Sequence, residues 1–306
     1  MSRYKREFAG YAPGLSLSMR QDPEGGPVVA CVGKWRNEQA RTQNELLILI
    51  HGFNNNQYEA QQAYSGFRDL QRELVSIGTA ARLEDLLGDA FWPGDAKWAG
   101  PLDWLDFLVY PATIAGAKET AERLCAYLLQ RRDVLELSFV GHSMGCRVVL
   151  ETIARLRAEP GFQIPIKKVC LMAAAVPTFA VCPGGALEPA FSAAEEVKVL
   201  HSRDDMVLSY AFPAGQTLAG DGFLPQAVGL HGHVPRSGRV SVQSVDGAGH
   251  SDYWGWQNSM ASVKAATYIS QFLDLEASAR EIPVMTAAPP VGTPVRSGPA
   301  AREVGE

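Results

Sequence analysis

Ser143 lies in the pentapeptide GHSMG at 141–145, which has the G-x-S-x-G pattern. The apolar run 135–140 precedes this pattern, and apolar residues at helical spacing follow it over 149–156. A serine on a tight turn from strand to helix is held out of the sheet, and its flanking glycines leave room for neighbouring backbone. We therefore predict that Ser143 is a nucleophile with the Met144 amide beside it. An ordinary glycine-rich turn is the alternative.

A serine hydroxyl needs a base beside it near neutral pH, and a histidine can serve as that base. His250 ends the segment DGAGH, which directly follows the alternating apolar run 240–245. A loop at the carboxyl end of that strand would meet the serine at the same edge of a parallel sheet. We predict that His250 is the base. His142 adjoins the serine in the chain and cannot easily face its hydroxyl, so the next candidates are His231 and His233.

The third group should be a carboxylate that orients the imidazole and stabilises its protonated form. Asp204 and Asp205 both directly follow the strand-like run 197–200. We favour Asp205, because the apolar residues after it suit a turn that re-enters the core, whereas Asp204 suits a helix cap. Asp252 is a weaker option. The resulting chain order is serine, acid, histidine, which is the order of the α/β-hydrolase fold.

A second oxyanion donor is expected in the segment HGFNNN at 51–56, which follows the apolar run LLILI at 46–50. Gly52 permits a sharp bend, after which the Phe53 amide can face the serine. The two predicted donors are therefore the backbone amides of Phe53 and Met144. We assign the histidine of this segment to the loop and not to the base. The alternative is a polar loop whose asparagines cap a helix.

The elements that would position these residues alternate between strands and helices. The apolar runs predict strands, and positions spaced three and four apart predict helices. Repeated alternation of this kind predicts an α/β fold with a mostly parallel sheet and helices on both faces. The expected strands are 28–32, 46–50, 107–110, 135–140, 166–173, 197–200 and 240–245, and the expected helices are 63–74, 114–128, 149–156 and 263–272.

One domain is expected over 1–280, followed by a tail at 281–306 that is rich in proline and alanine and has no regular period. A stretch of fewer than 20 residues at 177–195 separates two expected strands and suits a small cap. The segment 215–235 is expected to be a second, irregular loop near the acid and the base. Three tryptophans either line the acyl pocket or pack on the core; they are Trp92, Trp98 and Trp104.

Composition excludes several classes of protein. The chain has 306 residues, 46% hydrophobic and 20% charged, which is typical of a globular protein. Its net charge of −5 gives no support for a nucleic-acid partner. The five cysteines do not form a disulfide framework, so a reducing compartment, the cytoplasm, is expected. We expect no signal peptide, and the sequence has no apolar stretch of about 18 residues that would span a membrane.

Motifs for metals and cofactors are also missing from the sequence. It contains no H-E-x-x-H, no paired C-x-x-C and no calcium loop of the D-x-D-x-D-G type. The dipeptide at 33–34 lacks the partners of a phosphate-binding loop, and the segment 247–252 lacks the third glycine of a dinucleotide motif. We expect a reaction with a small acyl ester that needs neither metal nor cofactor. No feature indicates an oligomeric state.

Four segments together resemble the α/β-hydrolase superfamily: HGFNNN, GHSMG, DDMV and GAGH. The segments at 91–93, 110–112 and 117–128 resemble one bacterial branch of it, an uncharacterised α/β-hydrolase-like group once catalogued as a domain of unknown function. The resemblance covers about residues 25–275.

This resemblance implies an esterase- or lipase-like serine hydrolase with Ser143 as nucleophile, His250 as base and Asp205 as acid. It supplies a mechanism but no natural substrate. An acyltransferase, thioesterase or amidase would use the same three residues. The alternative of another class is a catalytically silent scaffold that uses the fold to bind proteins, because fold alone does not fix function.

Overall fold

The computed structural model describes most of the chain. Among the sequence-based expectations, the tail at 281–306, Trp98, Trp104 and residues 107–109 of one expected strand lie outside the described residues. The described ranges are 13–41, 44–75, 83–94, 110–235, 237–255 and 259–275.

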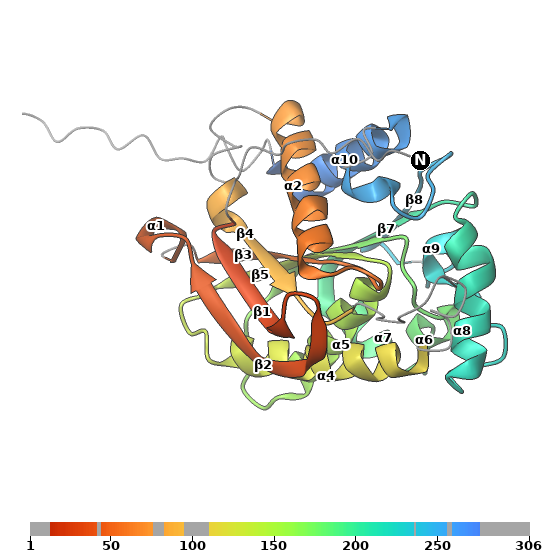
Figure 1. The fold of residues 1–306 in the computed structure, drawn as a ribbon, viewed down its shortest axis with the longest axis horizontal. Coiled ribbons are helices and arrows are strands. Elements are labelled where there is room, and N and C mark those ends of the chain that lie inside the picture. The colour runs from red at the N-terminus through yellow and green to blue at the C-terminus, as the bar shows by residue number, and fades with distance from the viewer. Residues whose placement is uncertain are drawn as a thin grey trace, which may run out of the picture.

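An eight-stranded sheet forms the centre of the described chain, in the order β2-β1-β4-β3-β5-β6-β7-β8 (Figure 1). All neighbours pair in parallel except β1 and β2, which form an antiparallel hairpin at one edge. The predicted mostly parallel sheet is therefore confirmed. The strands are β1 (Leu15–Asp22), β2 (Gly25–Trp35), β3 (Glu45–Ile50), β4 (Leu87–Phe91), β5 (Glu136–His142), β6 (Ile166–Met172), β7 (Ala194–His201) and β8 (Val240–Ser244).

The central strands are covered on both faces, which explains the unbroken apolar run of β3. In β3 every residue after Glu45 is buried, and β4 is buried throughout. At the β2 edge the burial is incomplete, as expected for a strand with one free side. Parallel pairing brings the carboxyl ends of β3, β5, β7 and β8 to one edge of the sheet.

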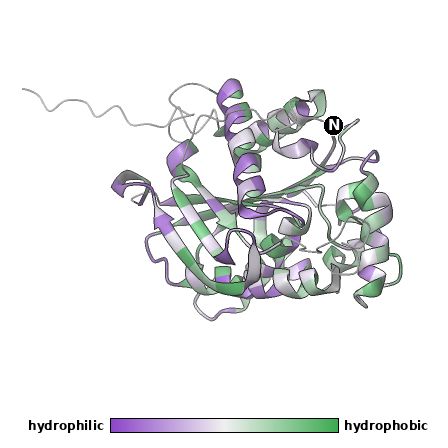
Figure 2. Ribbon diagram, viewed as in Figure 1, coloured by the Kyte–Doolittle hydropathy of each residue, from purple (hydrophilic) through white to green (hydrophobic). Residues whose placement is uncertain are grey.

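Two layers of helices enclose the sheet (Figure 1). On one face α2 (Gln57–Leu74) packs beside α10 (Met260–Leu273), and on the other α4 (Tyr110–Leu129) packs against α5 (Met144–Ala158). A further short helix, α1 (Glu38–Arg41), follows β2. Figure 2 shows that α2 is largely hydrophilic where it faces outward, while its inner side buries Tyr64, Phe67 and Leu70. No helix among the described residues is both long enough and apolar enough to cross a bilayer.

Short helices cover the carboxyl edge of the sheet as a small cap. Between β6 and β7 lie α6 (Thr178–Val181) and α7 (Glu188–Ala193), within the stretch expected to be a cap. Between β7 and β8 a π-helical turn, η2 (Val207–Ala211), runs into α8 (Phe212–Leu218), and α9 (Val228–His231) follows. A 3₁₀ turn, η3 (Asp252–Trp254), follows β8.

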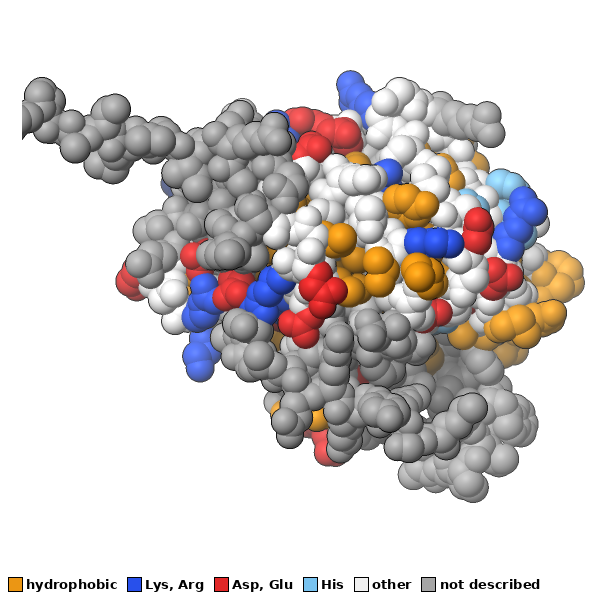
Figure 3. All heavy atoms as spheres, turned by 90° about the horizontal axis from the view of Figure 1, so that it is seen from above, with side chains coloured by type: hydrophobic (Ala, Val, Ile, Leu, Met, Phe, Trp, Pro, Cys, Tyr) orange, Lys and Arg blue, Asp and Glu red, His pale blue; other side chains and the backbone are white. Residues whose placement is uncertain are grey.

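The expectation of an irregular loop over 215–235 was partly wrong, because α8 continues to Leu218 and α9 lies within this segment. Pro213 and Gly215 are poor helix formers in a helix interior, so the sequence of this segment did not indicate a helix. Pro213 lies in the first turn of α8, where proline fits without loss of a hydrogen bond. Hydrophobic side chains reach the surface here, among them Tyr210, Leu218 and Phe223. In the space-filling view, hydrophobic side chains gather at the edge on the side of α8 (Figure 3).

Candidate active site

Ser143 sits between β5 and α5 in a strained backbone conformation, with φ 53° and ψ −123°. A positive φ is costly for a residue with a side chain, and such strain is often found at functional sites. The preference for glycine at two positions of the motif follows from the atoms that a Cβ would meet there. A Cβ on Gly145 would lie 2.4 Å from the carbonyl oxygens of Ile50 and His51, and one on Gly141 would lie 3.0 Å from the Cys146 backbone. A side chain at Gly145 would therefore force the backbone to shift, and one at Gly141 would require a smaller adjustment of its neighbours.

The hydroxyl of Ser143 lies 2.9 Å from Nε2 of His250. On the other side of the ring, Nδ1 of His250 lies 2.7 Å from Oδ2 of Asp205. An ionised carboxylate can only accept, so Nδ1 carries the proton and Nε2 accepts the serine O–H. The structure thus brings together the three residues that the sequence selected, from loops after β5, β7 and β8.

These three residues are largely withdrawn from solvent. Asp205 is fully buried, Ser143 is 6% exposed and the side chain of His250 is 16% exposed. The second oxygen of Asp205, Oδ1, accepts the Leu208 amide at 3.0 Å, which fixes the carboxylate at the start of the η2 turn. The helix-capping role proposed for Asp204 therefore belongs to Asp205, because its carboxylate reaches the free amide of the following turn.

The other two carboxylates considered for the acid hold the loop that carries His250. Oδ2 of Asp204 accepts the Gly247 amide at 2.9 Å. Oδ2 of Asp252 accepts the Gly249 amide at 2.7 Å, and its Oδ1 accepts the Ser259 hydroxyl at 2.8 Å. Neither carboxylate is hydrogen-bonded to the His250 ring in this arrangement.

Two further histidines lie close to the serine but do not face its hydroxyl. Nε2 of His142 lies 2.7 Å from the His250 carbonyl oxygen. His51 donates from Nδ1 to the Gly52 carbonyl at 2.9 Å, and its Nε2 accepts the Trp92 amide at 3.3 Å. Burial lowers the pKa of each of these two imidazoles to about 3, so both are neutral near pH 7.

His231 and His233, the alternative bases, lie beside each other at the end of α9, with ring centroids 5.4 Å apart. Nδ1 of His233 is 3.3 Å from the side-chain oxygen of Gln226. No hydrogen bond joins either ring to Ser143 among those of the described residues, so the structure favours His250 over both.

The loop after β3 packs directly on the serine. A Cβ on Gly52 would lie 2.9 Å from Cβ of Ser143, so no larger residue fits there. The Asn55 amide group donates to the Phe53 carbonyl at 3.0 Å, which supports the bend of the chain. Asn56 forms a capping box with Glu59 at the start of α2. The segment therefore contains the asparagine cap that was considered as its alternative, and its Gly52 packs on Ser143.

Two residues that the sequence analysis did not single out, Tyr64 and Arg20, hold this loop from behind together with Trp92. The Tyr64 hydroxyl accepts the His51 amide at 2.8 Å and donates to the Ala90 carbonyl at 2.6 Å. Trp92, which is fully buried, donates from its indole to the His51 carbonyl at 2.8 Å. Arg20, in β1, donates to the Trp92 carbonyl at 2.8 Å and to the Asn55 carbonyl at 3.4 Å. For Trp92, packing in the core replaces the pocket-wall alternative.

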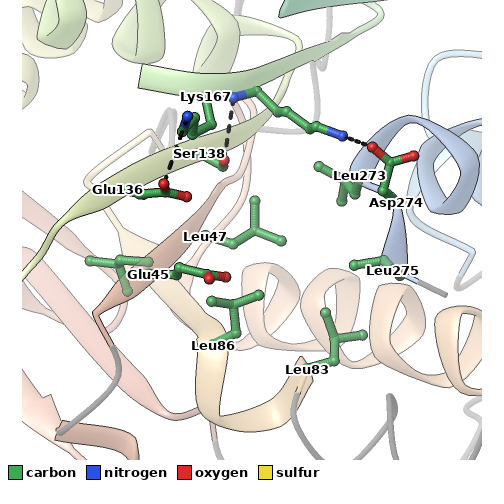
Figure 4. A pocket seen from close by; sticks show the side chains of 12 residues that line it. Glu45, Leu47, Leu83, Leu86, Glu136, Ser138, Lys167, Leu273, Asp274 and Leu275 are labelled. Atoms are coloured by element: carbon green, nitrogen blue, oxygen red, sulfur yellow. Dashed lines mark hydrogen bonds and ion pairs between the residues drawn. The ribbon is translucent and has the colours of Figure 1, made fainter. Parts of the chain in front are cut away.

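A cavity of about 270 Å³ lies at the opposite end of the sheet from these residues (Figure 4). It is lined by the first residues of β3, β5 and β6 and by leucines from the end of α10 and from the turn before β4. Ion pairs of Glu136 with Lys167 and of Asp274 with Lys168 border it. Because β5 spans seven residues, the cavity lies about 20 Å from Ser143 and takes no part in this site.

No three His, Cys, Asp or Glu side chains of the described residues converge as a metal-binding group. The groups that meet at this edge of the sheet are the hydroxyl, imidazole and carboxylate already described. This set of groups is suited to acyl transfer through a serine.

The solved structures with which the chain aligns include the three that follow. A predicted CIB-like hydrolase from Thermoplasma acidophilum aligns at 14% identity over 78% of this chain and 91% of that one, with a TM-score of 0.40. An esterase/lipase from an uncultured bacterium aligns at 11% identity over 87% and 86%, with a TM-score of 0.44. Est1E from Butyrivibrio proteoclasticus, with ferulic acid bound, aligns at 14% identity over 85% and 95%, with a TM-score of 0.39. No curated protein matches the sequence.

One family model matches the chain over residues 32–214, which is more than half of its length. The matched segment contains Ser143 and Asp205, and His250 follows it. The family is described as "Alpha/beta hydrolase of unknown function (DUF900)". The order and direction of the strands agree with this description, and the chain belongs to this family of α/β-hydrolases.

Proposed function

We propose that the protein is a serine hydrolase that cleaves carboxylic esters through an acyl-enzyme. The observation that carries this proposal is the unbroken chain of hydrogen bonds from Asp205 through His250 to Ser143. An isolated serine hydroxyl is a weak nucleophile, and an imidazole held at 2.9 Å from it can remove its proton as it attacks.

In the first half of the reaction, Oγ of Ser143 attacks the ester carbonyl carbon while Nε2 of His250 takes the hydroxyl proton. The tetrahedral oxyanion is stabilised by the backbone amides of Met144 and Phe53, and one such donor typically changes the rate by about 10²–10³-fold. The intermediate collapses, the bond to the alkoxide breaks, and His250 returns its proton to the departing oxygen. An alcohol leaves and the acyl group stays on Ser143.

In the second half, water replaces the alcohol. Nε2 of His250 takes a proton from the water as its oxygen attacks the acyl carbon. The new tetrahedral intermediate expels Oγ of Ser143, which regains its proton from His250, and the carboxylic acid is released. Throughout, Asp205 holds Nδ1–H and stabilises the imidazolium without taking its proton.

Hydrophobic residues exposed beside this edge of the sheet support an apolar acyl ester as the substrate class. Met206 and Val207 directly follow the acid in the chain and are 65% and 42% exposed. The five cysteines, all described, are unpaired, which supports placing the protein in a reducing compartment such as the cytoplasm.

A panel of p-nitrophenyl esters with acyl chains of graded length tests the proposal. We expect the wild type to turn over at least one ester, and Ser143→Ala to lose the activity. Ser65→Ala is the matched control, because the hydroxyl of Ser65 donates only to its own helix at Gln61, and it should keep the wild-type rate. Equal turnover by wild type and Ser143→Ala would refute the assigned nucleophile.

Added alcohols and amines separate hydrolysis from acyl transfer in the same assay. A hydrolase releases the free acid even when these acceptors are present, whereas a transferase converts the acyl group into a new ester or amide. No turnover of esters, thioesters or amides by folded wild type would favour the silent scaffold instead.

A further inference from the structure

His142 connects the two loops that meet at Ser143. Its Nε2 lies 2.7 Å from the carbonyl oxygen of His250, the proposed base. On its other side, a Cβ on Gly52 would lie only 3.1 Å from Nδ1 of His142, so the ring touches the loop that carries the proposed oxyanion donor. The ring is 5% exposed. A buried histidine thus sits between the oxyanion loop and the base loop, one residue from the nucleophile.

The direction of this hydrogen bond follows from its partner. A backbone carbonyl can only accept, so Nε2 of His142 carries the proton and donates. Because burial keeps this ring neutral near pH 7, Nδ1 is an unprotonated acceptor, and it has no hydrogen-bond partner. The neutral His142 ring therefore makes one hydrogen bond, and its acceptor is the backbone carbonyl of His250, the proposed base.

The base loop is held by amide anchors on the residues before His250. Asp204 accepts the Gly247 amide and Asp252 accepts the Gly249 amide. Among the hydrogen bonds of the described residues, the bond from His142 is the one made to the backbone of His250 itself. The bond joins the side chain of His142, the residue next to Ser143, to the backbone carbonyl of His250. It therefore links the backbone at the nucleophile to the backbone at the base.

We propose that His142 is a positioning residue for the proposed reaction: its Nε2–H holds the His250 carbonyl and thereby keeps the imidazole in line between Asp205 and Ser143. This inference rests on the proposed serine-hydrolase function. Such positioning can have a large effect on the rate, because a shift of about 1 Å at a reacting group can lower the rate by about 10²-fold.

A neutral His142 also suits the charge change at its neighbour. The ring centroids of His142 and His250 are 5.1 Å apart. When His250 takes the serine proton it becomes a cation, and a second cation at this distance would oppose that step. Burial keeps His142 uncharged at neutral pH, so the donor that positions the base adds no repulsion to it.

The test compares His142→Phe with His142→Gln. Phenylalanine keeps a ring of similar shape beside Tyr253 and Trp254, whose ring centroids lie 6.1 and 5.8 Å away, but it has no donor. Glutamine places an amide N–H close to the position of Nε2. With a short p-nitrophenyl ester we expect kcat of His142→Phe to fall by about 10–100-fold with KM changed less than about threefold. His142→Gln should recover most of the loss.

A role in packing alone predicts a different pattern, in which Tm falls in both variants and kcat follows the folded fraction. Wild-type kcat in folded His142→Phe, or a His142→Gln variant as slow as His142→Phe, would overturn the proposal. Should His142→Phe fail to fold, His142→Asn takes its place, because its shorter amide does not reach the carbonyl.

A second readout does not depend on turnover and separates this proposal from the proposed function. The proton on Nδ1 of His250, bonded to Asp205, should give a far-downfield NMR signal in the wild type. We expect it to weaken or broaden in His142→Phe and to persist in His142→Gln. If the wild type shows the signal but hydrolyses nothing, the proposed function fails while the positioning role is still decided by these spectra. An unchanged signal in His142→Phe would contradict it.

Discussion

Asp204 accepts the amide of Gly247 at 2.9 Å, and in doing so it pins the loop that carries His250. Its neighbour Asp205 instead faces the His250 ring at 2.7 Å. Two adjacent carboxylates therefore serve the same histidine in different ways, one through the backbone of its loop and one through its imidazole. Because Asp204 and Asp205 have different partners, substituting each in turn tests whether Asp205 is the acid.

We predict that Asp205→Asn lowers kcat by about 10⁴-fold, because an amide in place of the carboxylate favours the wrong tautomer of His250. The asparagine oxygen can still accept the Leu208 amide, so the fold should be kept. Ester hydrolysis and thermal unfolding of the purified variant give the two measurements.

Asp204→Asn is the matched control for that prediction. Its side-chain oxygen can still accept the Gly247 amide, so we expect kcat to fall by less than about tenfold. A larger loss in Asp204→Asn than in Asp205→Asn would reverse the assignment of the acid.

Substitution of Gly145, the glycine of the elbow nearest β3, should destabilise the protein. In Gly145→Ala, the new Cβ would meet two backbone carbonyl oxygens at 2.4 Å, and the backbone must shift to relieve this contact. We expect a loss of about 1–3 kcal/mol in the free energy of unfolding, measured in urea. The ester rate should fall as well, since the displaced carbonyls, at the end of β3 and the start of the loop after it, lie just before Phe53 in the chain.

Gly116→Ala offers the comparison, because Gly116 lies within α4 and a Cβ there would meet no atom within 4 Å. Alanine is the better helix former, so the free energy of unfolding should rise by about 0.4–1 kcal/mol without effect on the rate. Equal stability of the two alanine variants would show that the elbow is looser than described.

Acid should destabilise the protein through its buried histidines. Burial lowers the pKa of both His51 and His142 from 6.5 to about 3, so the folded state binds these protons more weakly than the unfolded chain does. Their contribution to stability is complete above pH 6.5 and is lost as the pH falls from there towards 3. Each histidine costs up to about 1.4 kcal/mol per pH unit in this window.

His142→Gln isolates one histidine's share of this effect. Urea unfolding at several pH values between 7 and 4 should give a shallower loss of stability in this variant than in the wild type. Parallel curves for the two proteins would mean that His142 is not held in its neutral form by the fold.

The sheet was largely predictable because parallel strands buried on both faces leave apolar runs, which are continuous in β3 and shorter in β5 and β6. Two strands escaped notice. The sequence of β4 carries Asp89 at its centre, and only the structure shows that this buried carboxylate pairs with Arg68 of α2. The alternating strand β1 lies near the N-terminus and pairs with β4, a partner distant in the chain. Tyr110, expected to end a strand, begins α4.

The choice of Ser143 followed from a local pattern, because the elbow needs glycines at fixed positions. Asp204 and Asp205 could be separated only by three-dimensional contacts, since each follows the same strand and each has a carboxylate. The bond from His142 left no trace in the sequence, because its acceptor is a backbone carbonyl 108 positions away. A backbone acceptor is the same in every residue type, so sequence motifs cannot predict which carbonyl a side chain will contact.

Covalent labelling by a fluorophosphonate tests the central claim most directly. Folded wild type at neutral pH should gain one phosphonyl group, with loss of fluoride, and peptide mapping should place it on Ser143. His250→Ala should label far more slowly, and Ser143→Ala should not label. The absence of an adduct on folded wild type, or an adduct on a residue other than Ser143, would contradict the account.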